Sequence, residues 1–352
     1  MSRRPFIVPV FIPHAGCPHR CAFCNQSAVT GCGHPLPTPA EVRESVEAFL
    51  KFRGRRQGPV QIAFFGGNFL GVAPETVTRL LAEATGFVRA GAVEGIRFST
   101  RPDTVSARTL ALIEPFPVHT VELGVQSMAP EVLARSQRGH TPEDTVHATR
   151  LLKKRGYAIG HQLMVGLPGD NEERLLATGR SVIGLKPDFI RIYPTLVLPG
   201  SLLETWHRRG LYSPLTLEAA VGLTLVLYRL FRAHAIPVTR MGLQAAEGLP
   251  SGEAEGAGPY HPAFGHLVMC AAFRNAVRGA LDSFRPAGPT LRLHVHPQSI
   301  SRMRGLNNAT IGELQERFGF VRVAVCAEPA LAPEDIGVGG LERVVSTITG
   351  LS

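Results

Sequence analysis

The sequence predicts an α/β protein: a partly closed barrel of six parallel strands, followed by a small α+β unit. Six short apolar or β-branched stretches alternate with stretches of helical periodicity. Because parallel neighbours need a crossover connection, this alternation favours a parallel sheet. Polar and glycine-rich residues follow the strand ends, where barrel enzymes place their chemistry. The 352 residues exceed one typical domain, which favours a large domain with an appendage.

The barrel elements can be justified in order along the chain. Residues 6–12 are apolar and β-branched, which predicts a first strand ahead of a cysteine-rich loop. Thr38 to Glu41 form a capping box with a proline at the first helical position, which predicts a helix up to about Phe52. Further strands are expected at 60–65, 95–99, 120–125, 157–165 and 189–195, and further helices at 74–89, 110–113, 141–155 and 171–185.

Composition indicates a soluble globular protein, with 44% apolar and 18% charged residues. Six cysteines are too few for a disulfide scaffold, and three of them stand together, which favours metal binding in a reducing compartment. The most apolar predicted helix, 217–231, contains Glu218 and Arg229 and is shorter than a bilayer span. We therefore expect a cytoplasmic protein without a membrane partner.

The charge balance is basic, with 37 Lys and Arg against 28 Asp and Glu, or +9. Such an excess favours a polyanionic partner such as a nucleic acid. Basic residues near the ends of helices also complement the helix dipole, so charge alone leaves both interpretations open.

The stretch GCPHRCAFCNQ collects Cys17, Cys21 and Cys24 within eight residues. A closed thiolate site usually takes four ligands. One interpretation is a structural zinc knuckle with His14, His19 or Cys32 as the fourth ligand. The other is an iron-sulfur cluster in which three thiolates leave one position open.

Sequence blocks along the chain favour the second interpretation. The C-x3-C-x2-C spacing, with Phe23 before the last cysteine, resembles the signature of the radical S-adenosylmethionine (SAM) superfamily. Several blocks, in this order over about residues 5 to 245, resemble the radical SAM domain of the Elongator catalytic subunit family, and some are also similar to coproporphyrinogen-dehydrogenase-like proteins. These blocks are FFGGNF, STRPD, ELGVQS, RGHT, GLPGD and IYPTLVLPGS.

The resemblance implies a TIM-like radical SAM barrel that holds a 4Fe-4S cluster and cleaves SAM to methionine and a 5'-deoxyadenosyl radical. It implies that Cys17, Cys21 and Cys24 each bind one iron, that SAM occupies the fourth, and that an electron donor such as a flavodoxin or ferredoxin is a partner. It assigns SAM binding to residues after the second and fourth strands, while the catalytic residues stay unknown. The candidates are Gly66, Gly67, Asn68, Glu122, Gln126 and Ser127.

Several of these residues have simpler interpretations. Gly66 and Gly67 could form an ordinary strand-end turn. Glu122 could be a paired structural carboxylate, so Gln126 is the better SAM candidate of the two. Arg101 and Asp103 could pair within their loop, and His161 could be a satisfied core histidine.

Three functions remain open. The leading one is a radical SAM enzyme that acts on RNA, with tRNA as partner and wobble-uridine modification as the model. The alternatives are an enzyme for a small or porphyrin-like molecule, and a non-catalytic cluster protein. The Elongator family carries an acetyltransferase domain after the radical SAM domain, whereas residues 251–265 here read SGEAEGAGPYHPAFG. Acetyl transfer is therefore not carried over.

These patterns divide the chain into a barrel domain at 1–245, a linker and helical extension at 246–289, and a small α+β domain at 290–352. In the last domain we expect a strand at 291–295, helices at 299–304 and 308–318, and a strand at 320–325. This order resembles a KH-type RNA-binding module, with residues 305–308 in place of the GxxG loop and Arg302 and Arg304 beside it. The alternative is an appendage that only closes the barrel mouth.

Overall fold

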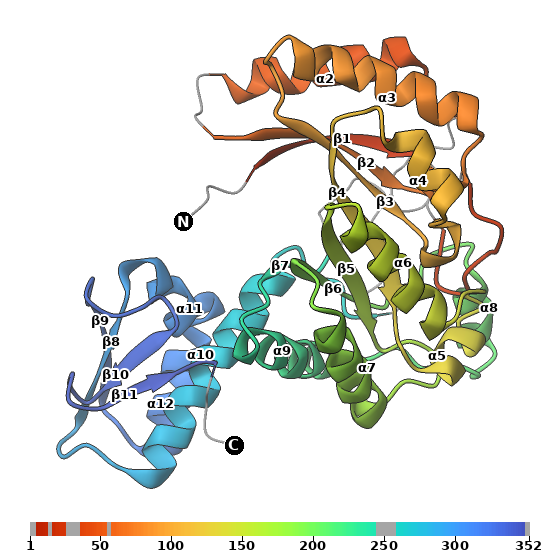
Figure 1. The fold of residues 1–352 in the computed structure, drawn as a ribbon. Helices are drawn as coiled ribbons and strands as arrows, with labels where there is room; N and C mark the ends of the chain where they lie inside the picture. The colour runs from red at the N-terminus through yellow and green to blue at the C-terminus, as the bar shows by residue number, and fades with distance from the viewer. Residues whose placement is uncertain (1–4, 13–15, 26–35, 55–57, 244–257, 349–352) are drawn as a thin grey trace.

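The computed structural model describes residues 5–12, 16–25, 36–54, 58–243 and 258–348 (Figure 1). The chain forms a curled parallel sheet with helices on its outer side and a second, smaller sheet near the C-terminus. Among the described residues, every helix is too short or too polar to cross a lipid bilayer.

The large sheet has seven parallel strands in sequential order, one more than the sequence predicts. The missed strand, β7, has only four residues, none of them fully buried, so it lacks a readable apolar pattern. Pairing keeps the carboxyl ends of neighbouring strands level, for example Ile12 with Gly66. The strands are β1 (Phe6–Ile12), β2 (Val60–Gly66), β3 (Gly95–Thr100), β4 (Val118–Gln126), β5 (Ala158–Val165), β6 (Phe189–Pro194) and β7 (Val238–Met241).

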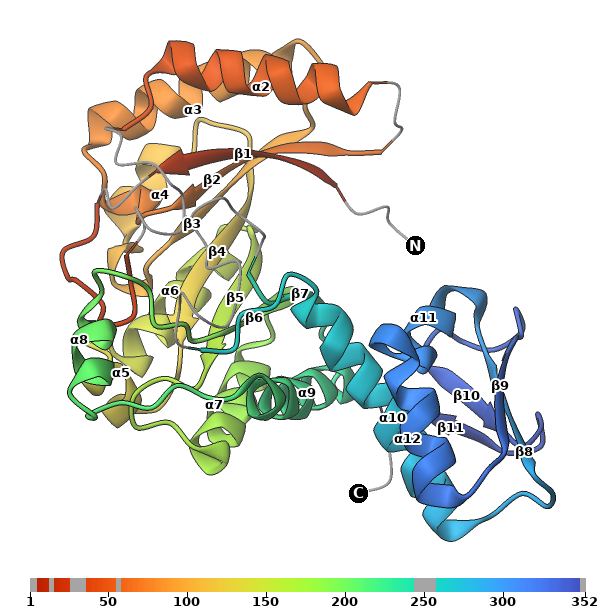
Figure 2. The ribbon, with the colours of Figure 1, turned by 180° about the vertical axis from the view of Figure 1, so that it is seen from behind.

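Helices follow the strands and cover the outer face of the sheet, with α2 and α3 beside β1 and β2 (Figure 2). Thr38, Ser106 and Thr141 each close a capping box, which fixes where three of the helices begin. The helices of this part are α2 (Pro39–Arg53), α3 (Pro74–Arg89), α4 (Ala107–Ile113), α5 (Pro130–Arg135), α6 (Pro142–Lys154), α7 (Glu172–Leu185), α8 (Leu202–Arg208) and α9 (Leu217–Ala233).

The barrel core lies between the sheet and these helices. Phe69, in the turn after β2, stacks on Phe64 and Phe98 with ring centroids 4.9 and 4.8 Å apart. Burial of each ring contributes about 1.5–3 kcal/mol. The turn that follows β2 is thereby anchored to the ends of two strands.

The C-terminal unit has four strands in the order β11-β10-β8-β9. Its β8–α11–α12–β9 segment has the predicted order, and β8 and β9 are parallel, as a crossover connection requires. The antiparallel strands β10 and β11 were not predicted from the sequence. The elements are α10 (Phe264–Ser283), β8 (Thr290–Val295), α11 (Ile300–Arg304), α12 (Ala309–Phe318), β9 (Arg322–Ala327), β10 (Asp335–Val338) and β11 (Val344–Ser346).

Helix α9 contributes to two hydrophobic cores. Leu227 and Phe231 pack into the barrel core. Ala220, Leu225 and Tyr228 pack into the second core together with α10 and the small sheet. The helix in the predicted 246–289 extension is therefore a central element of the C-terminal core. The exact domain boundaries stay a prediction.

Candidate functional site

The cysteine loop lies across the carboxyl ends of several strands, and backbone hydrogen bonds fix it there. The Ala22 N–H donates to the Ser136 carbonyl at 2.9 Å, and the Leu203 N–H donates to the Ala22 carbonyl at 2.8 Å. The Asn25 side-chain amide donates to the Pro199 carbonyl at 2.6 Å. The loop is thus tied to the segments that follow β4 and β6, which is the edge predicted for the chemistry.

Asn68 attaches the start of the cysteine loop to β3. It is fully buried, and its Nδ2 donates to the Gly16 carbonyl at 2.6 Å. Its Oδ1 accepts hydrogen bonds from Thr100 Oγ1 at 2.7 Å, the Arg101 N–H at 3.0 Å and Thr104 Oγ1 at 2.9 Å. These four bonds and the full burial of the side chain favour a structural role for Asn68.

Gly16 meets Asn68 at a very close approach. Its φ is +71°, and a Cβ there would lie 2.3 Å from the Asn68 carbonyl oxygen. Only glycine fits this backbone conformation and this space. The residue directly before Cys17 is therefore fixed by packing.

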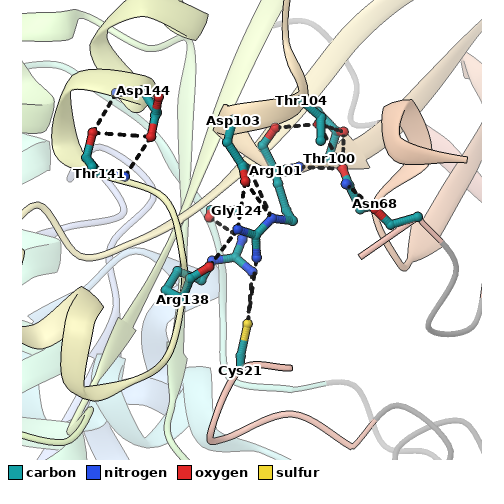
Figure 3. Close-up of polar contacts among 11 residues, drawn as sticks. Cys21, Asn68, Thr100, Arg101, Asp103, Thr104, Gly124, Arg138, Thr141 and Asp144 are labelled. Carbon is teal, nitrogen blue, oxygen red and sulfur yellow. Dashed lines mark hydrogen bonds and ion pairs between the residues drawn. The ribbon is translucent and has the colours of Figure 1, made fainter. Parts of the chain in front are cut away.

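Two buried arginines point at Cys21 (Figure 3). Arg138 Nη1 lies 3.3 Å from Cys21 Sγ, and Arg101 Nη1 lies 3.9 Å from it. Arg101 donates to Asp103 Oδ2 at 2.9 Å and to the Arg138 carbonyl at 2.6 Å, which confirms the Arg101–Asp103 pair. Arg138 donates to the Gly124 carbonyl at 2.7 Å. Two fixed positive charges therefore stand where a thiolate ligand would carry negative charge.

Burial and charge act in opposite directions at Cys17. Burial raises the pKa of its thiol, and the nearby Arg138 guanidinium lowers it. Among the described residues, no three Cys, His, Asp or Glu side chains gather as ligands for a single ion. In a cubane cluster each thiolate binds a different iron. Three cysteine thiolates, one of them beside two arginines, therefore fit the ligand set of a cubane iron–sulfur cluster.

The predicted SAM candidates after β4 occupy different environments. Gln126 and Gln162 exchange two side-chain hydrogen bonds of 3.1 and 2.8 Å across β4 and β5. Ser127 Oγ is buried at 3.2 Å from Thr178 Oγ1 of α7, and it accepts the Ala129 N–H at 3.1 Å. Gln126 thus belongs to a polar pair at the strand ends, whereas Ser127 mainly connects β4 to α7.

Glu122 lies further inside the sheet and is paired with two arginines. It is 2% exposed, with Oε1 2.5 Å from Arg97 Nη2 and Oε2 bonded to Arg191. The Arg191 guanidinium also lies 5.3 and 5.2 Å from the ring centroids of Phe65 and Tyr193. The interpretation as a paired structural carboxylate agrees with these contacts.

The family models decide the identity of the barrel. Residues 11–182 match the model of the radical SAM superfamily, and residues 187–272 match that of the Radical_SAM C-terminal domain. The chain belongs to the radical SAM superfamily. It is thereby a member of an enzyme superfamily, as the cysteine spacing predicts.

The relatives of this radical SAM chain include proteins named for tRNA. A tRNA uridine(34) acetyltransferase of Dehalococcoides mccartyi is 29% identical over an alignment of 230 positions, and the match covers 56% of this chain and 50% of the relative. Human Elongator complex protein 3 is 25% identical over an alignment of 285 positions, and the match covers 66% of this chain and 52% of the relative. The chain spans about half the length of these curated relatives.

A solved structure supports the fold. The Elp3 of the archaeon Methanocaldococcus infernus, with its N-terminus deleted, superposes with a TM-score of 0.59 at 22% identity. The match covers 76% of this chain and 62% of that one. Because the two sequences are only 22% identical, this similarity is evidence for the fold and not for the function.

Two histidines of the radical SAM domain are buried. His140, which was not considered, is buried near Arg138 and Arg101, and burial followed by these charges lowers its pKa to about 3. The RGHT block was the available signal for it. His161 packs against α6, with Nε2 3.0 Å from Thr149 Oγ1, as a core histidine would. His14 and Cys32, named as zinc ligands in the alternative, lie outside the described residues.

Proposed function

We propose that this chain is a radical SAM enzyme that acts on RNA, with a tRNA uridine as the model substrate. Cys17, Cys21 and Cys24 would each hold one iron of a 4Fe-4S cluster, and SAM would complete the site. Bound there, the cluster would supply the electron for reductive cleavage of the sulfonium carbon–sulfur bond of SAM. An electron donor such as a flavodoxin or ferredoxin and a cytoplasmic location belong to the same proposal.

The observation that carries the iron–sulfur part of the proposal is the anchored cysteine loop, with two arginines beside Cys21. Arg101 and Arg138 would offset the negative charge of thiolates and sulfide in a site that is partly closed to water. Their own carbonyl and carboxylate partners prevent them from turning away. These residues hold the site in place before any group binds.

The other residues would orient SAM. The backbone of Gly66 and Gly67 follows β2 at the same edge of the sheet, where a missing side chain permits close approach of a methionine moiety. Gln126 would offer an amide to the ribose or carboxylate if its pairing with Gln162 opens. The inner face behind them carries Arg97 and Arg191 around one carboxylate, which suits a polar, anionic substrate.

Anaerobic reconstitution tests the enzyme activity. Purified protein is loaded with iron and sulfide, reduced in the presence of SAM, and assayed for 5'-deoxyadenosine. Cys17→Ala, Cys21→Ala and Cys24→Ala should each abolish the visible absorbance of the cluster and the cleavage of SAM. Cys326→Ala, which removes a thiol in β9, serves as the matched control and should retain both. Near-stoichiometric iron and sulfide in the triple variant would reject the assignment.

The choice of substrate has its own test. The loaded enzyme is incubated with total tRNA, SAM and reductant, and the nucleosides are analysed by mass spectrometry. A new or altered uridine that depends on SAM supports the proposal, which relies on the names of the relatives. SAM cleavage without change in any nucleoside and without RNA retention would redirect the search to a small or porphyrin-like molecule.

A further inference from the structure

A groove of about 600 Å³ lies in the C-terminal unit, away from the cysteine loop. Its volume is within the range of ligand-binding sites in proteins. One side is the first part of α12, and the other is the edge strand β9, with the turn between α11 and α12 at one end. The lining residues are Arg304, Asn307, Asn308, Ile311, Gly312, Gln315, Arg322, Val323, Ala324 and Val325.

The groove combines an apolar floor with a positively charged rim. Val323, Val325 and Ile311 supply partly buried apolar surface, while Arg304 and Arg322 are exposed. Among the described residues that line the groove, none is acidic. This composition complements a chain of negative charges that carries flat, partly apolar groups, as a single-stranded nucleic acid does.

The backbone around the groove adds hydrogen-bonding groups. β9 is an edge strand of the described sheet, so part of its backbone faces the groove and not a neighbouring strand. Such an edge offers alternating N–H and C=O groups, which match the polar edges of nucleobases. Gln315 Nε2 donates to the Val321 carbonyl at 2.8 Å and so fixes α12 relative to the start of β9.

The turn at the end of the groove has a fixed shape. Asn307 and Asn308 both have positive φ values, 51° and 62°. Gly305 has φ +75°, and a Cβ there would lie 2.6 Å from Thr310 Oγ1. The turn therefore depends on glycine at 305 and tolerates asparagine at 308, the position where the KH pattern has its second glycine.

We infer that this groove binds a single-stranded RNA segment, with its phosphates at Arg304 and Arg322 and its bases over Val323 to Val325. The inference rests on the proposed function for the identity of the polymer. Of the two arginines beside the 305–308 loop, Arg304 lines the groove and Arg302 does not. The Arg302 guanidinium instead acts to lower the pKa values of Tyr228 in α9 and of His266 and Cys270 in α10.

Variants of the full-length protein test the groove by fluorescence anisotropy with a labelled 12-nucleotide single-stranded RNA. Arg304→Gln with Arg322→Gln should weaken binding at least about tenfold. Loss of two phosphate contacts should also flatten the plot of log affinity against log salt by about 1.4. The matched control is Arg292→Gln with Arg302→Gln, which removes the same charge from the same unit and should leave affinity within about twofold.

A second pair of variants fills the groove without changing charge. A Cβ at Gly312 would meet no atom within 4 Å, so both Ala and Phe can be introduced without a clash at this atom. Gly312→Phe should block RNA binding by occupying the groove. Gly312→Ala should retain binding and stabilise α12, since alanine favours helices over glycine by about 1 kcal/mol.

The outcomes separate this inference from the proposed function, because SAM cleavage without substrate is measured on the same preparations. Weaker RNA binding in the groove variants, with unchanged SAM cleavage, supports the inference. RNA binding that is equal in wild type, Arg304→Gln/Arg322→Gln and Gly312→Phe overturns it, and it would leave a protein partner as the candidate occupant. A wild-type protein that cleaves SAM but does not bind single-stranded RNA overturns it as well.

Discussion

Replacement of Asn68 by alanine should detach the cysteine loop from the barrel. In the wild type its amide makes four hydrogen bonds with described residues in a fully buried position. The Thr100 and Thr104 hydroxyls already lie 3.0 Å apart and can satisfy one another. The loss therefore falls mainly on the Gly16 carbonyl and the Arg101 N–H.

The magnitude follows from these two orphaned groups. Each buried backbone group without a partner costs about 1–3 kcal/mol, so we expect Asn68→Ala to lower the free energy of unfolding by about 4 kcal/mol. The Gly16 carbonyl belongs to the residue before Cys17, so cluster retention should fall too. Thr104→Val is the matched control: it removes one hydroxyl from the same amide oxygen and should cost about 1 kcal/mol with the cluster retained.

Two measurements check this prediction. Urea unfolding of the apoprotein under anaerobic conditions gives the change in stability, and iron and sulfide analysis after reconstitution gives cluster retention. An Asn68→Ala protein within 1 kcal/mol of the wild type that holds a full cluster would refute the reasoning. Loss of SAM affinity alone, with stability and cluster unchanged, would show that the side chain serves the cofactor directly.

Three other predictions concern the barrel. Glu122→Gln should lower the free energy of unfolding by about 3–5 kcal/mol in urea unfolding, because Arg97 and Arg191 lose their carboxylate; unchanged stability with lost SAM binding would contradict it. Burial lowers the pKa of His161 from 6.5 to about 3, so the unfolded chain binds the extra proton. The contribution of His161 to the free energy of unfolding should therefore fall by about 1.4 kcal/mol for each pH unit below 6.5. His161→Gln should remove this pH dependence of stability. Gly67→Val should weaken SAM binding in equilibrium titrations and leave iron content unchanged; unchanged affinity would make Gly67 a turn residue only.

The sequence predicts those features that depend on local pattern. Capping boxes and alternating apolar stretches locate most strands and helices, and the Arg101–Asp103 pair is two residues apart. Strand β7 was missed because four residues carry too little pattern. β10 and β11 are similarly short. β10 pairs with the distant strand β8, and β11 pairs with β10.

The geometry of the site depends on contacts between distant segments. Arg101 and Arg138 stand 37 positions apart, yet both reach Cys21. Asn68 joins Gly16 to the end of β3 across similarly long separations. Sequence blocks indicate that such residues matter, but they do not say whether a side chain contacts a cofactor or supports its neighbours. Asn68 and Ser127 are two residues whose contacts favour support.

The shared helix α9 has a thermodynamic consequence. Its residues belong to both hydrophobic cores, so the barrel cannot lose the C-terminal unit without exposing Leu225 and Tyr228 to water. The two units should unfold in a single cooperative transition, and a fragment that ends near residue 245 should aggregate. A ligand that binds only the folded form of one unit then stabilises the other by the same free energy. Binding of a ligand to either unit should therefore raise the melting temperature of the whole chain.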